Sequence, residues 1–267
     1  MNEQKRIIAI VLAVGLIAAA FMISNRWKKS TAVLKTPKTP QNRSAMAKKP
    51  VDRVEFLTEV FKDIKPTENV ARLLQKDPRS LPEDSLEVIL KWSLEARIDP
   101  LTVMIESDLA MKNPTEENMT TAARNLISAA TQYQETPIIS AWMFQQGKII
   151  IDKGMALNDK NIPLRNALIT YISEFENEPM KFLTLLRETL ALDSNNVETH
   201  FIHLNLLFKS EQWEKAIEKC KKLISLQPQN PEWLFRMSHI YGMTGDSTNA
   251  KVYKDLAVRV QKKQKSN

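Results

Sequence analysis

The side chains best suited to hold a metal ion are three histidines. His200 and His203 are three residues apart, so on a helix they would lie on one face, as two metal ligands could. A protein metal site needs a third and usually a fourth ligand, and the sequence has no cysteine cluster to complete one. His239 is the remaining histidine. We therefore expect the three histidines to be packing or interface residues, and we predict no metal and no cofactor.

A thiol and an imidazole could instead form a nucleophile and its base. Cys220 is the only cysteine, but it falls on the apolar face of a predicted helix, and no third residue is spaced to orient a pair with His203. Glu106 and Asp108 are two residues apart and so face different sides of a helix. Gly147 and Gly154 are isolated, so there is no glycine-rich phosphate loop. These patterns predict that the protein is not an enzyme.

The elements that position these side chains are predicted to be helices throughout residues 51–264. Several prolines open apolar runs with a helical period, often after a residue that can cap a helix, as in Asp99-Pro100 and Thr136-Pro137. No strand is expected. The predicted helices cover residues 52–64, 67–76, 83–97, 100–112, 114–135, 138–157, 163–176, 179–192, 196–209, 211–226, 231–244 and 247–263.

The C-terminal part of the sequence repeats with a period of 34 residues. In residues 197–230 the second predicted helix places Ala216 between bulky apolar residues, and residues 231–264 place Ala250 one period later. Two antiparallel helices cross closely where one side chain is small. The period, the small crossing residue and a proline at the end of the unit resemble the tetratricopeptide repeat (TPR). Residues 163–196 match weakly, because Phe182 occupies the small position.

The resemblance implies a superhelix of two regular hairpins and one degenerate hairpin, with residues 51–162 as a preceding helical region. In TPR proteins the first helix of each hairpin lines a concave surface that binds peptides or partner helices. The positions of this sequence that match that surface include aromatic, polar and charged residues: Tyr171, Phe175, Phe201, Asn205, Phe208, Lys209, Phe235, His239 and Met243. Alternatively, Phe201, Phe208 and Phe235 are covered by the preceding helices. A carboxylate clamp is not expected, because Glu232 has the wrong charge for one.

An apolar segment near the N-terminus predicts membrane attachment. Residues 7–23 contain no charge, are flanked by basic residues and would span about 26 Å as a helix, close to a bilayer core. A cleaved signal peptide is the alternative, since Ala18-Ala19-Ala20 could form a cleavage site. The apolar residues that follow this alanine run favour an anchor over residues 1–25. The side of the membrane on which the helical region lies is left open.

Residues 26–50 are predicted to form a basic, proline-containing linker. Residues 1–50 carry a net charge of +9, so the rest of the chain is near neutral at −2 and is not expected to bind nucleic acid. The linker could contact anionic lipid headgroups or could serve only as a solubilising spacer. The basic residues that would make the lipid contact are Arg26, Lys28, Lys29, Lys35 and Lys38.

An anchor, a linker and TPR-like repeats together resemble membrane-anchored bacterial TPR proteins. This resemblance implies a single-pass cell-membrane protein that acts as a scaffold or adaptor and binds a protein or peptide partner. The alternative is a structural subunit of a membrane-associated complex that has no free peptide groove. The polar residues of the last predicted helix favour the adaptor, because they would protect the open end of the repeat stack.

Overall fold

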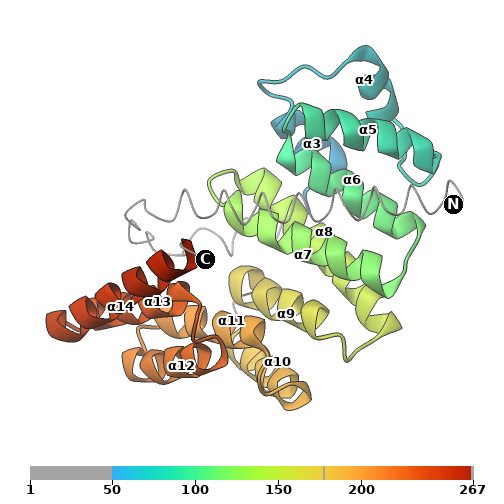
Figure 1. Cartoon of the computed structure of the whole chain (residues 1–267). Helices are drawn as coiled ribbons and strands as arrows, with labels where there is room; N and C mark the ends of the chain where they lie inside the picture. The colour runs from blue at the N-terminus through green and yellow to red at the C-terminus, as the bar shows by residue number, and fades with distance from the viewer. Residues whose placement is uncertain (1–49, 177, 266–267) are drawn as a thin grey trace, which may run out of the picture. The chain divides into compact units, whose positions relative to one another are not determined.

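The computed structural model describes residues 50–176 and 178–265, and within these ranges the protein is all-helical, as predicted. It has twelve α-helices, one π-helical turn and no strand over those residues (Figure 1). The helices are α3 (Arg53–Val60), α4 (Glu68–Leu74), α5 (Glu83–Glu95), α6 (Asp99–Lys112), α7 (Glu116–Gln132), α8 (Pro137–Leu157), α9 (Ile162–Tyr171), α10 (Pro179–Leu192), α11 (Val197–Lys209), α12 (Trp213–Leu226), α13 (Pro231–Met243) and α14 (Ser247–Lys265).

None of these helices is long and apolar enough to cross a membrane. The predicted anchor over residues 1–25, and all but the last residue of the predicted linker over 26–50, lie outside the described ranges. The five linker residues named for lipid contact lie there too.

Caps and prolines explain most of the helix starts. The side chains of Asn161, Asn196 and Asn230 each accept a hydrogen bond from a backbone N–H in the first turn of the helix that follows. Proline stands in the first turn of α6, α8, α9, α10 and α13, where its missing N–H costs no helical hydrogen bond. Asp99 differs from the prediction, since it is already helical and Ile98 precedes it as the cap residue.

A first hydrophobic core is built from α3 to α9. Helices α7 and α8 pack side by side along their length (Figure 1), and Phe56 of α3 stacks on Trp142 of α8 with ring centroids 4.2 Å apart. Gly154 of α8 has a structural role, because a Cβ atom there would lie 2.7 Å from Leu164 Cδ1 and 3.0 Å from Met119 Cβ. The absence of a side chain lets α8 approach both α7 and α9 closely.

A second core is built from α11 to α14 and follows the 34-residue repeat. Ala216, Leu204 and Leu223 are fully buried within it, together with Met237. Helices α13 and α14 also approach closely, because the Ser238 hydroxyl donates to the Ala250 carbonyl oxygen over 2.7 Å. The small residues therefore lie where two helices meet, as the repeat pattern predicted.

The degenerate hairpin, α9 and α10, packs mainly with the first core. Phe182 and Leu185 of α10 lie against first-core residues, and α9 continues into a π-helical turn, Ile172–Glu176. The link from this hairpin to α11 is polar, since the buried Thr199 hydroxyl lies 2.8 Å from Asn166 Oδ1. The two cores thus divide between α10 and α11.

Candidate partner-binding surface

Helices α11 and α13 each have one line of buried side chains and, beside it, a second line of side chains that are more accessible. Leu204 and Leu207 of α11, and Met237 and Ile240 of α13, lie in the second core. The predicted concave positions fall outside this buried set. Those of α11 and α13 are Phe201, Asn205, Phe208 and Lys209, then Phe235, His239 and Met243, and all of them are half-buried or exposed.

An aromatic stack joins the two helices. The Phe208 and His239 rings lie nearly parallel, at 11°, with centroids 5.6 Å apart. The Phe208 ring also contacts Trp213 of α12, with an angle of 86° between the two ring planes, and this contact holds the ring in place. His239 is exposed and Met243, one turn further along α13, is 50% exposed. These side chains form an accessible apolar and aromatic surface on a rigid pair of helices.

Arg236 adds a second link between α11 and α13. Its guanidinium lies 5.0 Å from the centre of the Phe201 ring, a cation–π geometry. One of its nitrogens donates to Asn205 Oδ1 over 3.5 Å, and another pairs with Glu232 over 3.2 Å. The arginine charge is therefore matched by a neighbouring carboxylate, which agrees with the expectation that no clamp for a peptide carboxylate forms here.

Lys209 is likewise paired. Its ammonium contacts the Glu174 carboxylate, which lies in the π-helical turn after α9. The lysine side chain is half-exposed, whereas that of Glu174 is largely buried. This ion pair connects the second core to the degenerate hairpin at the edge of the surface.

Tyr171 does not share this exposure, and Phe175 is half-buried. Tyr171 is buried, and both rings pack against Phe144 of α8, with centroids 6.2 and 5.2 Å from it. Burial, with smaller effects from nearby acidic groups, raises the pKa of Tyr171 to about 12. A partner could reach Tyr171 only if the first core opened, so the accessible surface excludes it. No local signal in the sequence links α9 to Phe144.

Phe201 is also committed to packing. Its ring lies 5.5 Å from that of Trp233 and belongs to the border of the second core. This contact is with α13, which follows α11 in the chain, and not with a preceding helix. We define the partner surface by five of the predicted positions on α11 and α13: Asn205 and Phe208, which are half-buried like Phe201 and Phe235, and the exposed Lys209, His239 and Met243.

Two of the residues first considered for chemistry, His200 and Cys220, have structural partners. His200 Nε2 donates to the Ser194 carbonyl oxygen over 2.9 Å, and Cys220 Sγ donates to the Trp233 carbonyl oxygen over 3.1 Å. Burial raises the pKa of the Cys220 thiol to about 12, which disfavours a nucleophilic thiolate.

Glu106 and Asp108 are also separated, as their spacing predicted. Glu106 accepts from Asn125 over 2.8 Å, while Asp108 pairs with Arg53 over 2.7 Å. Burial raises the pKa of both carboxyl groups. In the part of the chain that the structure describes, no three side chains of the histidine, cysteine or acidic types are grouped to hold a metal.

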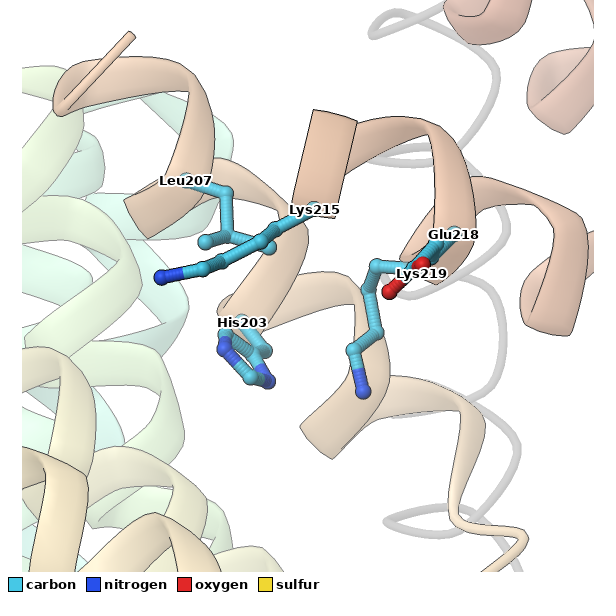
Figure 2. Close-up of a pocket in the computed structure, with 5 residues that line it drawn as sticks. All are labelled: His203, Leu207, Lys215, Glu218 and Lys219. Carbon is cyan, nitrogen blue, oxygen red and sulfur yellow. The ribbon is translucent and has the colours of Figure 1, made fainter. Parts of the chain in front are cut away.

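A separate pocket between α11 and α12 was not foreseen. It has a volume of about 240 Å³ and is lined by His203, Leu207, Lys215, Glu218 and Lys219 (Figure 2). It shares no residue with the partner surface. The sequence signal that could have located it is the four-residue spacing of Lys215 and Lys219, which places both on one face of α12.

Comparisons with known proteins match no family model and no curated protein. Solved structures similar in fold include MamA from Desulfovibrio magneticus RS-1, with 13% identity over 68% of this chain and 96% of that chain, at a TM-score of 0.49. Another is MamA MSR-1, with 14% identity over 70% of this chain and 99% of that chain, at a TM-score of 0.44. At such scores the likeness carries no argument about function, which must come from the surfaces described above.

Proposed function

We propose that this protein is an interaction scaffold that binds a protein partner on the surface of α11 and α13, and that binding alone is its activity. The observation that supports this is the Phe208 and His239 stack beside exposed Met243, since these side chains are held rigidly yet stay accessible. Rigid aromatic and methionine side chains are favoured anchors of protein interfaces.

The charges around the surface suggest what kind of partner it accepts. Lys209 is paired with Glu174, and Arg236 with Glu232, so the surface offers little unmatched charge. A partner that depended on charge attraction would gain little from it. We therefore propose a peptide or helix that inserts an apolar or aromatic side chain beside the Phe208 and His239 rings, with affinity that changes little with salt.

A double variant tests this surface. His239→Ser with Met243→Ser removes accessible contact area and leaves the buried Met237 and Ile240 unchanged. We expect loss of native partners recovered with the full-length protein from detergent extracts, measured by quantitative mass spectrometry, with an unchanged circular dichroism spectrum. Val54→Ser is the matched control, because Val54 is 72% exposed on α3 and outside the surface. Equal recovery by the double variant and the control would refute the proposal.

We further propose that residues 7–23 anchor the scaffold to a membrane and that residues 26–50 act as its tether. The support is the uncharged apolar run between basic flanks. A tethered scaffold would raise the local concentration of its partner near the bilayer. Removing residues 1–25 should move the protein from the membrane fraction to the soluble fraction, whereas retention in the membrane fraction would contradict the anchor.

One observation favours the second candidate, a structural subunit of a larger complex. Val252 and Leu256 are four residues apart on α14 and are 55% and 42% exposed, so they form an apolar spot among the polar residues of the last helix. Sedimentation of the full-length protein in detergent distinguishes the candidates. A stable oligomer that Leu256→Ser dissociates would favour the subunit, and a monomer would favour the adaptor.

A further inference from the structure

The pocket between α11 and α12 brings cationic side chains to one place. Lys215 and Lys219 reach from successive turns of α12 toward His203 of α11, and Figure 2 shows their side chains on either side of the histidine ring. All the lining residues belong to α11 and α12, and helix α10 contributes none.

The two lysine charges have no carboxylate partner. Among the described residues, neither ammonium has an acidic oxygen within 4.0 Å. Instead, Lys215 Nζ donates to Gln212 Oε1 over 2.8 Å, and Lys219 Nζ donates to His200 Nδ1 over 3.2 Å. Both acceptors are neutral, so each ammonium keeps its charge unmatched and has donors to spare.

The charges that surround His203 are also mainly positive. Burial, then Lys219, His200 and Lys215, lower its pKa to about 4. Glu218 is the one acidic residue in the pocket lining. The imidazole is therefore neutral at pH 7, with one N–H that can donate.

The His203 ring contributes a neutral polar group to the pocket lining. Its Nδ1 atom is buried, and no hydrogen-bond partner for it exists in the described part of the chain. A buried polar atom without a partner is costly, since it has lost water and gained nothing. A ligand oxygen in the pocket could accept from the ammonium groups of both lysines, whereas this nitrogen is covered by the protein itself.

From this geometry we propose that the pocket binds a phosphate group, either as free phosphate or as a phospholipid headgroup. A phosphate carries close to two negative charges at neutral pH and several acceptor oxygens, which match two unpaired ammonium groups and the histidine N–H. A carboxylate would match only one of the charges and fewer donors. The site is independent of the proposed partner surface and would persist if that proposal failed.

Histidine NMR provides the direct test, because the chain has only three histidines to assign. Full-length protein in a zwitterionic detergent is titrated with phosphate and, separately, with chloride at matched ionic strength. Bound phosphate should stabilise the imidazolium, so we expect the His203 pKa to rise by about one unit or more in phosphate alone. His239, which lies outside the pocket, should not respond. An identical His203 titration in the two salts would overturn binding of free phosphate.

Charge-removing variants distinguish binding of phosphate in the pocket from a general attraction of phosphate to positive charge on the protein. Lys215→Gln and Lys219→Gln should each weaken phosphate binding by about tenfold or more, as expected for loss of a charge-assisted hydrogen bond. Lys221→Gln is the matched control, since it removes the same charge from an exposed position of α12 outside the pocket. Equal weakening by Lys219→Gln and Lys221→Gln would overturn the proposal.

Vesicles identify the source of the phosphate. Full-length protein is assayed by flotation with phosphatidylcholine vesicles that contain or lack phosphatidic acid. Weaker flotation of the Lys215→Gln, Lys219→Gln double variant, with no loss for Lys221→Gln, would assign the site to a lipid headgroup. If the lysine variants weaken phosphate binding in the NMR titration but do not change flotation, the site binds free phosphate. If neither assay depends on them, the proposal is overturned.

Discussion

Replacing Ala216 by leucine tests whether the 34-residue pattern marks real helix contacts. Ala216 is fully buried in the second core among Leu204, Cys220 and Leu223. A leucine adds three carbon atoms at a position where the alanine side chain is already fully covered by its neighbours. Overfilling a packed core typically costs about 1 to 3 kcal/mol, because side chains must leave preferred rotamers and helices must separate.

The size of the resulting thermal shift depends on how the two cores unfold. If the second core, residues 197–265, unfolds separately, each kcal/mol should lower its melting temperature by about 4 to 8 °C. If it unfolds together with the first core, the larger unit should respond by about 2 to 4 °C per kcal/mol. The buried residues of the two cores form separate clusters, which favours separate unfolding.

Differential scanning calorimetry of full-length protein measures both outcomes. We expect two transitions, of which only one moves in Ala216→Leu. The control is Lys221→Leu, which adds an apolar side chain of the same kind at an exposed position of the same helix and should change stability by less than about 0.5 kcal/mol. Equal melting temperatures for the two variants would refute the repeat register.

Three further predictions follow from buried groups. Cys220, with its pKa raised to about 12 by burial, should react with iodoacetamide at pH 8 about 10³-fold more slowly in the folded protein than in urea, and equal rates would show an accessible thiol. Thr199→Val should cost about 1 to 3 kcal/mol in urea unfolding, because it leaves the buried Asn166 oxygen without its donor, and a neutral effect would mean that this link is not formed. Burial and nearby cations lower the pKa of His203 from 6.5 to about 4. As the pH falls, the unfolded state therefore takes up a proton on this residue before the folded state does. Stability should thus fall by about 2 kcal/mol from pH 7.5 to pH 5, and His203→Gln should remove this part of the loss in urea titrations.

The helices could be predicted from the sequence because their ends carry local signals. Asparagine caps and first-turn prolines act within a few residues, so they are visible in the sequence alone. The second core could also be predicted from the sequence, since its buried residues recur at a fixed period and pack against their neighbours in the chain. Asp99 shows the limit of such signals, because the helix begins at this expected cap residue, one residue before the predicted start at Pro100.

The partner surface could be predicted only in part. Its α11 and α13 positions follow from the repeat, whereas Tyr171 and Phe175 depend on Phe144, which belongs to a helix outside the repeat pattern. The pocket between α11 and α12 depends on how His203 of one helix lies against Lys215 and Lys219 of the next. Contacts between residues far apart in the chain leave no periodic signal, so these features required the structure.

Site-specific photo-crosslinking tests the central proposal, binding of a partner on α11 and α13, most directly. A photoreactive phenylalanine is placed in the full-length protein at His239 or Met243, and at the control positions Glu214 and Lys221, which are exposed on α12. We predict that one partner forms adducts at His239 and Met243 and that neither control position yields them. Adducts of equal yield at all four positions, or at the controls alone, would contradict the account.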